Sequence, residues 1–461
     1  MTSAEIPQKS KLERLLSIVT VVEPGEGVTA LLMSLNIFLL LAAYYVLKPV
    51  REVFVTTEWA NTGTAIMALL LIPTVIAYGA VARRVARKKL IAYVTAFFIS
   101  NLVIFYVLAE IQFRYMGILF FIWVGIFNNM VIAQFWAYGN DIYRPDQGKR
   151  LFPLIMLGAS FGAILGPLVP PRLADLLGIH PLLLVAGGVL AICIALTIWI
   201  DNRERPAPCK ELREQSACET LGREGGFELI WKHRYLLYIA MLIVVLNVVN
   251  TTGEQIRRAT FNEHARVSAL AADPGLAGER LDDAVNNAKL QLNSDFFFWV
   301  NLLSVLIQAF LVSRILKFLG IGGALLLVPL VVSLGYGAMA LLPTLLVVRM
   351  VKIVENSQDY SLMNTLRAAL YLPTTREIKY KAKQAIDTFF VRLGDLVASG
   401  IWFVGIHQIA LSIPGFARLM LVLVAAWLFL AVCISREYRR MFPEESRLPG
   451  PAKAAASGAG G

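Results

Sequence analysis

The sequence predicts an all-α membrane protein in which twelve transmembrane helices form two six-helix bundles. Of its 461 residues, 57% are hydrophobic and only 16% are charged, and the mean hydropathy is +0.64. These values are far more apolar than those of soluble proteins. Apolar runs of the roughly 20 residues that cross a bilayer recur along most of the chain, which favours helices over the short alternating strands of a membrane barrel.

The expected elements follow in chain order. Residues 1–27 lack an apolar core followed by a small-residue cleavage site, so we expect a cytoplasmic arm and no cleaved signal peptide. A first bundle over 28–201 and a second over 233–436 are joined by a polar, turn-rich linker at 202–232, and 437–461 form a flexible tail. The spans are expected at 28–54, 63–81, 90–109, 116–140, 150–170, 181–200, 233–254, 293–313, 319–341, 345–370, 385–406 and 415–435.

Lysine and arginine predict the orientation. They concentrate after the second, fourth, tenth and twelfth spans, which predicts that both termini lie in the cytoplasm. The membrane expected is the inner membrane of a bacterial cell. The same bias accounts for the net charge of +11, so nucleic acid is not an expected partner. One exception is the stretch 261–297, which we expect to be a long loop of mixed charge.

Charges close the first span in the stretch YYVLKPVREVF. If the helix ended at Leu47, then Lys48, Arg51 and Glu52 would lie in the interface, where long cations extend routinely to water. If the helix continued to Phe54, the two cations would be three residues apart on one face and would line a cavity. The outward position of this end and the apolar residues that follow favour the cavity.

Ionisable residues also lie inside the tenth span. Lys352, Glu355, Asp359 and Arg367 fall within a single crossing, at spacings that keep most of them on one polar face. Such groups are costly in a membrane and usually face a water-filled path or a partner. They would therefore bind substrate, neutralise one another as structural ion pairs, or do both.

Further candidates lie near the ends of other spans. Asn250 and Glu254 close the seventh span, where polar side chains serve either function or contacts between helices. Candidates for coupling or gating are Glu52, Asp141, Lys149, Arg150, Asp359, Asp387 and Arg392.

No pattern of enzymatic chemistry is present. Gly158, Gly162 and Gly166 recur every four residues, which predicts a close packing face between helices and not a phosphate loop. The four histidines are scattered and the four cysteines have no metal-ligand spacing, so we expect no enzyme activity, no metal and no cofactor.

The chain resembles the ATP/ADP translocases of plastids and intracellular bacteria, and more closely their relatives in free-living bacteria, a branch of the major facilitator superfamily. The stretches that carry the resemblance are LKPVREVF, FWAYGNDIYRPDQGKRLF, LNVVNTTGEQI, DFFFWVNLLSVLIQAFLVSRI, DYSLMNTLRAALYLP and REIKYKAKQAIDTFFVRLGD. The resemblance implies a twelve-helix exchanger of ATP and ADP. It also implies that Arg51, with Lys48 beside it, and Lys383 are needed for exchange. This chain has Asn250 and Val124 where the family has acids.

The first hypothesis is a nucleotide antiporter that works by alternating access. Its substrate-binding residues would be Lys48, Arg51, Asn250, Glu254, Lys352, Glu355, Arg367 and Lys383, with the cations on the phosphates. The alternatives are a proton-coupled carrier of another organic anion, with Glu355, Asp359 or Glu52 titrating, and a membrane scaffold that does not transport. The partners expected are an anionic nucleotide and the lipid bilayer, and the oligomeric state is left open.

Overall fold

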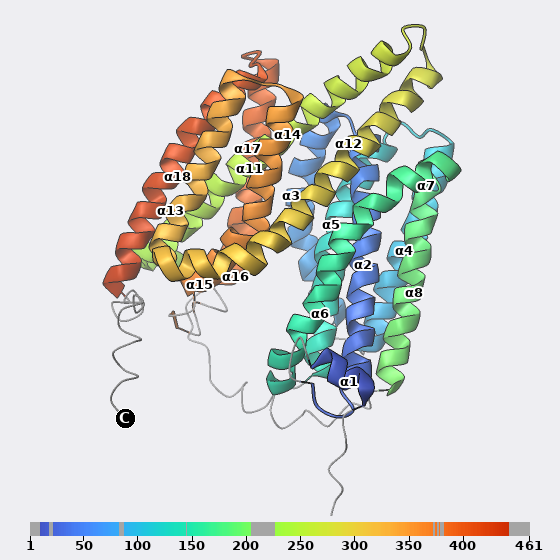
Figure 1. The fold of residues 1–461 in the computed structure, drawn as a ribbon. Helices are drawn as coiled ribbons and strands as arrows, with labels where there is room; N and C mark the ends of the chain where they lie inside the picture. The colour runs from blue at the N-terminus through green and yellow to red at the C-terminus, as the bar shows by residue number, and fades with distance from the viewer. Residues whose placement is uncertain are drawn as a thin grey trace, which may run out of the picture. The chain divides into compact units, whose positions relative to one another are not determined.

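The computed structural model describes residues 10–17, 22–82, 87–143, 145–203, 226–371, 374–375, 378 and 382–441. Within these residues the chain is helical and contains no strand (Figure 1). About half of the predicted arm and most of the predicted linker and tail lie outside them. The chain divides into two compact units, Met1–Gly63, Pro73–Glu219 and Leu276–Phe298 in unit 1 and Thr64–Ile72, Thr220–Gly275 and Trp299–Gly461 in unit 2. The arrangement as two bundles of six stays a prediction.

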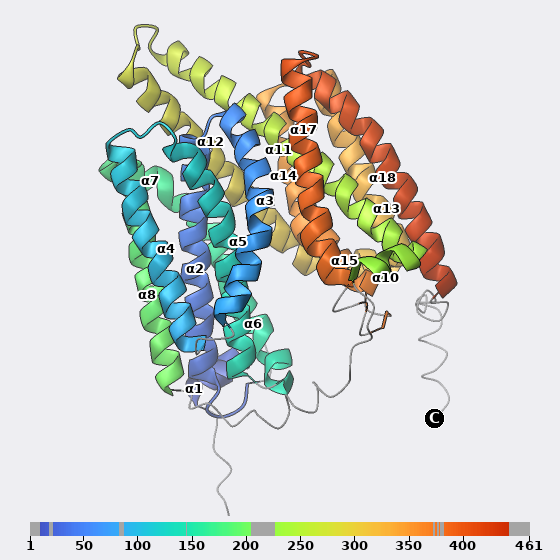
Figure 2. The same ribbon diagram turned by 180° about the vertical axis from the view of Figure 1, so that it is seen from behind.

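Helix α2 (Gly27–Phe54) is the centre of unit 1. It packs against α5 (Met116–Ile142), α6 (Pro145–Leu165) and α8 (Leu182–Arg203), as Figures 1 and 2 show from opposite sides. The other helices of this part are α3 (Thr57–Ala82), α4 (Arg87–Glu110), η1 (Gly166–Leu168) and α7 (Val169–Leu177). Because α2 is surrounded, a charged side chain on it can be buried at a depth where water is scarce.

The predicted glycine face is confirmed between α2 and α6. A Cβ atom on Gly158 would lie 2.2 Å from the carbonyl oxygen of Ser34, and one on Gly162 would lie 2.3 Å from that of Phe38. Real Cβ atoms do not approach so closely, so only glycine lets the two backbones meet here.

The short helix α1 (Lys11–Leu16) is fastened to the start of α2. The Glu13 carboxylate accepts hydrogen bonds from the backbone N–H groups of Ser10, at 2.7 Å, and Gly25, at 2.6 Å. These donors stabilise the ionised form and lower the pKa of Glu13 below its ordinary value of 4.5.

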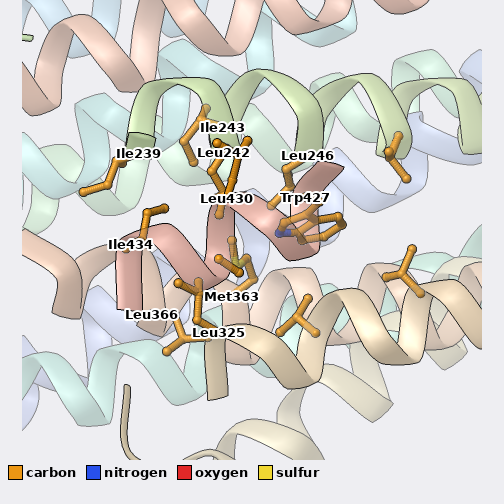
Figure 3. Packing of buried hydrophobic residues seen from close by; sticks show 14 of the residues in the cluster. Ile239, Leu242, Ile243, Leu246, Leu325, Met363, Leu366, Trp427, Leu430 and Ile434 are labelled. Atoms are coloured by element: carbon orange, nitrogen blue, oxygen red, sulfur yellow. The ribbon is translucent and has the colours of Figure 1, made fainter. Parts of the chain in front are cut away.

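Unit 2 is built around α11 (Arg234–Ala272), which packs against α14 (Leu345–Gln358), α17 (Val391–His407) and α18 (Ile413–Met441). Helix α13 (Val312–Leu341) lies along α18. Figure 3 shows their common core, where aliphatic side chains of α11 meet Trp427 and Leu430 of α18. The remaining elements are α10 (Gly226–Lys232), α12 (Glu279–Leu306), α15 (Asn364–Tyr371), α16 (Lys383–Ala385) and the π-helical segments η2 (Ile307–Leu311), η3 (Asp359–Met363) and η5 (Ile386–Phe390).

Nine helices in the described part are long and apolar enough to cross a membrane. One of them, Glu279–Leu341, covers two predicted spans, with non-helical torsion angles at Gly320 (φ 65°, ψ 179°) marking the break between them. The predicted span 345–370 is present as α14, η3 and α15 but carries too many charges to count among the nine.

The expected loop at 261–297 is wrong. Helix α11 continues to Ala272, and α12 starts at Glu279. The physical reason lies in the residues, because residues 261–272 include four alanines, a strong helix former, and no helix breaker occurs until Pro274 and Gly275. The mixed charges of this stretch therefore belong mostly to helices and not to a loop.

Candidate functional site

The first candidate cluster lies on α2. The helix continues through Pro49 to Phe54, so the charged residues are part of the helix and do not follow it. Lys48 is 7% exposed and Glu52 is 4% exposed, which places both inside unit 1 and not at a water-exposed end.

Aromatic rings surround the Lys48 ammonium group. Its Nζ lies 4.2 Å from the ring centre of Phe297, 5.1 Å from that of Tyr45 and 5.6 Å from that of Tyr44. A cation within about 6 Å of an aromatic face is attracted by the ring quadrupole, more strongly when water is excluded. The rings therefore compensate part of the cost of burying Lys48.

Arg51 pairs with its neighbour Glu52. Their Nη2 and Oε1 atoms are 2.6 Å apart, and the guanidinium carbon lies 4.5 Å from the ring centre of Phe121. The Nε atom of Arg51 is buried and has no hydrogen-bond partner among the residues that the structure describes. One donor of this guanidinium thus remains available to an acceptor that enters the site.

The second candidate cluster joins α11 and α14. The Lys352 side chain is fully buried, and its Nζ lies 2.9 Å from Glu355 Oε2 and 3.5 Å from Glu254 Oε1. It also donates to Asn250, at 3.2 Å to the side-chain oxygen and 3.4 Å to the backbone carbonyl. Four oxygens therefore hold one ammonium group, three of them from α11.

Further contacts complete this cluster around Glu254. Its Oε2 accepts a hydrogen bond from Arg257 Nε at 2.9 Å, and its Oε1 accepts one from Asn356 Nδ2 at 2.9 Å. The Arg257 side chain is fully buried. Two carboxylates, an ammonium and a guanidinium thus neutralise one another within unit 2.

Tyr336 and Gly253 border the same cluster. The Tyr336 hydroxyl donates to the Val249 carbonyl at 3.1 Å and lies 3.4 Å from both carboxylate oxygens of Glu355. A Cβ atom on Gly253 would lie 2.2 Å from that hydroxyl and 2.8 Å from Lys352 Nζ. A small cavity beside the cluster is lined by Asn250, Glu355, Asp359 and Trp427, among others.

Two other charges of the tenth span, Asp359 and Arg367, form a pair of their own, and Asp359 also lines the small cavity together with Glu355. Arg367 Nη2 lies 3.3 Å from Asp359 Oδ1, eight residues earlier, across the π-helical segment η3. The two side chains are about a quarter and a fifth exposed, at 25% and 21%. The single polar face expected from the spacing is therefore divided in two.

The predicted residues near the eleventh span also pair with acids. Lys383 contacts Asp387 and lies 5.8 Å from the ring centre of Tyr371, and both charged side chains are 38% exposed. Arg392 Nη1 contacts Asp395 Oδ2 at 2.8 Å, and Asp395 accepts a hydrogen bond from Thr251. Of these contacts, the hydrogen bond between Thr251 and Asp395 joins α11 to α17.

At the start of α6, the guanidinium of Arg150 forms two hydrogen bonds of 3.1 Å to the Glu26 carboxylate, just before α2 begins. The side chains of Asp141 and Lys149 lie outside the described part of the structure. Val124, where the resemblance implies an acid, is fully buried.

Several residues of the two clusters escaped the sequence reasoning. Arg257 had a local signal, because it follows Glu254 by three residues on a helix. Asp395, three residues after Arg392, had the same signal. Tyr336 and Phe297 had none, because they reach the clusters from helices far away in the sequence. Among the described residues, no group of histidine, cysteine and acidic side chains is arranged to hold a metal ion.

Comparison with known proteins adds a family and several relatives. A family model described as Major Facilitator Superfamily matches residues 27–372. ADP,ATP carrier protein 1, chloroplastic, of Arabidopsis thaliana is 25% identical over 356 residues, 71% of this chain and 55% of the relative. ADP,ATP carrier protein 5 of Rickettsia bellii is 23% identical over 442 residues, 80% of this chain and 84% of the relative. The chain thus spans about half the length of the plant relatives that it matches.

Solved structures agree on the fold. The nucleoside transporter NupG has a TM-score of 0.58 at 13% identity, covering 89% of this chain and 99% of that chain. An auto-inhibited peptide transporter of the POT family has a TM-score of 0.60 at 12% identity, covering 89% and 97%. At these identities the likeness concerns the helical fold alone.

Proposed function

The chain belongs to the Major Facilitator Superfamily, and from this premise we propose that it is a multi-pass carrier that exchanges ATP for ADP, or a related pair of anionic nucleotides, by alternating access. The observation that carries the proposal is the burial of cations in the helices. Lys48 on α2 and Arg257 on α11, both helices of membrane-spanning length, are buried, as is Lys352 on α14, and the side chain of Arg51 on α2 is only 11% exposed. Ionisable groups at such depth are expensive and usually serve transport. The similarity to ADP,ATP carriers supports the nucleotide as the substrate.

The chemistry of the substrate fits these side chains. ADP and ATP carry about three to four negative charges, so several desolvated cations are needed to bind the phosphates in place of water. The arginine fork suits two phosphate oxygens at once, whereas a lysine ammonium acts as a point charge. In this proposal the phosphate-binding residues are Lys48 and Arg51 of unit 1 and Lys352, Arg367 and Lys383 of unit 2.

Acidic partners hold four of these cations in the structure. Arg51 has Glu52, Lys352 has Glu355, Arg367 has Asp359 and Lys383 has Asp387. Phosphate oxygens would replace the carboxylates as partners, and the carboxylates would take the cations back when the nucleotide leaves. The carrier therefore keeps its cations neutralised in both conditions, which limits the cost of burying them.

Asn250 stands where the resemblance implies an acid, and the surrounding contacts supply a substitute. Its side-chain oxygen accepts from Lys352, and Glu254, one turn later on α11, lies 3.5 Å from the same ammonium. In this proposal Glu254 supplies, one turn later, the carboxylate that the resemblance implies at position 250. We further propose that the protein lies in a bacterial inner membrane with both termini on the cytoplasmic side.

Uptake of labelled ATP into proteoliposomes tests the proposal. Vesicles preloaded with ADP should accumulate label, and empty vesicles should not. Replacing Arg51 by Ala should abolish this uptake. Arg172→Ala should preserve it, because Arg172 is an exposed arginine of α7 whose guanidinium donates to the backbone carbonyl of Leu168. Equal uptake by Arg51→Ala and the intact protein would refute the role of this arginine.

A second candidate is a proton-coupled carrier of another organic anion. It is favoured by the buried carboxylates of Glu52 and Glu355, whose side chains are 2% and 7% exposed and could carry a proton across the membrane. Uptake into empty vesicles that follows an imposed pH gradient would support this candidate against exchange.

A further inference from the structure

The close contact between α11 and α14 depends on a glycine, Gly253, which has no side chain to separate the two helices. Asn250, Gly253, Glu254 and Arg257 follow one face of α11 at helical spacing, and Lys352 of α14 extends across this face. At Gly253 the hydrogen of glycine occupies the place where any other residue would have a Cβ atom. That atom would lie 2.2 Å from Tyr336 Oη, 2.8 Å from Lys352 Nζ and 3.3 Å from Lys352 Cδ.

The two neighbours of this position differ in their freedom to move. Tyr336 is fully buried in the core of unit 2, and its hydroxyl is held by the Val249 carbonyl. Lys352 has a flexible side chain. A Cβ atom at position 253 must be at least about 3.0 Å from its neighbours, so the ring must retreat by about 0.8 Å or more, or α11 must move away from α13 and α14.

Such a movement would affect the contacts of Lys352 unequally. Its three contacts to α11, at 3.2, 3.4 and 3.5 Å, are already at the long end of their range and would be lost. Its contact with Glu355, at 2.9 Å, lies within α14 and would move with the helix. The ammonium would remain paired but would leave its place beside Asn250 and Glu254.

We infer that Gly253 and Tyr336 are positioning residues for substrate, which together set the place of the Lys352 ammonium group at which a nucleotide phosphate binds. Gly253 leaves the space for Lys352 to reach α11, and the Tyr336 hydroxyl borders that space while facing Glu355. This inference rests on the proposed function for its substrate. A shift of about 1 Å in a binding group lowers productive binding by up to about a hundredfold.

The first arm of the test measures thermal unfolding in detergent without nucleotide. Gly253→Ala should lower the unfolding temperature by about 3 °C or more. Because Tyr336→Phe removes the atom in closest conflict, the effect of Gly253→Ala should be less than half as large in that background. The control Gly337→Ala should not lower the unfolding temperature, since a Cβ atom there meets no described atom within 4 Å and alanine favours a helix more than glycine does.

The second arm measures exchange of external ADP in proteoliposomes. Gly253→Ala should raise KM at least about tenfold with a smaller change in kcat, and adding Tyr336→Phe should restore part of the loss. Gly335→Ala is the matched control for general crowding, because its Cβ atom would lie 2.5 Å from Val351 of α14, an apolar contact. It should lower the unfolding temperature and leave KM unchanged.

The outcomes separate the two proposals. Equal effects of Gly253→Ala in both Tyr336 backgrounds, or an unchanged KM, would overturn the positioning role. If the intact protein exchanges no nucleotide while the unfolding arm behaves as expected, the proposed function fails and the position of Lys352 set by Gly253 and Tyr336 stands. A rise in KM for Gly335→Ala equal to that for Gly253→Ala would attribute the effect to crowding and overturn the inference.

Discussion

Removing the Lys352 ammonium should destabilise the protein strongly. Lys352→Met keeps most of the volume of the side chain but leaves Glu355 and Glu254 without the cation that lies 2.9 and 3.5 Å from them. The lysine side chain is fully buried, so water does not screen the loss. Removal of one partner from a buried ion pair lowers the free energy of unfolding by about 3–5 kcal/mol.

A second substitution distinguishes charge from packing. Glu355→Gln removes one of the two stranded carboxylates, while Glu254 keeps its contacts with Arg257 and Asn356. Lys352→Met combined with Glu355→Gln should therefore cost only about 1–3 kcal/mol, less than Lys352→Met alone.

Equilibrium unfolding in mixed detergent micelles, followed by tryptophan fluorescence, measures these free energies. Lys317→Met, an exposed lysine of the same unit, is the control and should change stability by less than about 0.5 kcal/mol. Lys352→Met as stable as this control, or a double variant whose loss equals the sum of the two single losses, would refute the reasoning.

Three further predictions follow. Gly162→Ala should cost about 1–3 kcal/mol in the same unfolding measurement, because a backbone carbonyl 2.3 Å away cannot yield. Gly188→Ala should not destabilise the protein, because a Cβ atom there meets no described atom within 4 Å and alanine favours a helix more than glycine does. Since the pKa of Glu13 is lowered in the folded protein, its stabilisation of α1 is present above pH 4.5 and is lost as the pH falls below that value. Hydrogen exchange of residues 11–16 should accelerate there in the intact protein and be insensitive to pH, once corrected for intrinsic exchange, in Glu13→Gln. Asn250→Asp adds a third carboxylate around Lys352 and should raise KM for ADP severalfold in the exchange assay, and a lower KM would contradict the competition between carboxylate and phosphate.

Much of the fold could be predicted because membrane helices obey simple rules of length and composition. The expected span 28–54 corresponds to α2, Gly27–Phe54, since the apolar residues on both sides of Lys48 and Arg51 continue one helical pattern. The glycine face at Gly158 and Gly162 could be predicted for a similar reason, because its spacing of four is set by the helix itself.

The partners of the charged residues could not be predicted in full, because they depend on contacts between distant parts of the chain. Lys352 meets Asn250 and Glu254 on another helix, about a hundred positions earlier. The π-helical segment that begins at Asp359 also breaks the regular spacing on which the expected single polar face was based. Local spacing identified the ionisable residues but not which of them face each other.

Because α11 is longer than expected, a small tilt of this helix at the Lys352 contacts displaces its far end by a large distance. At about 1.5 Å per residue, the 19 residues from Gly253 to Ala272 extend roughly 28 Å past the point where Lys352 is held. If this part of the helix pivots as a rod, a tilt of about 10° at Gly253 displaces its far end by roughly 5 Å. Ala272 is exposed, so a probe attached there would report a tilt of α11 about the point where the Lys352 ammonium is held. Replacement of a carboxylate by a phosphate as the partner of Lys352 would then be detected at the exposed end of α11, as a change in the angle of the helix.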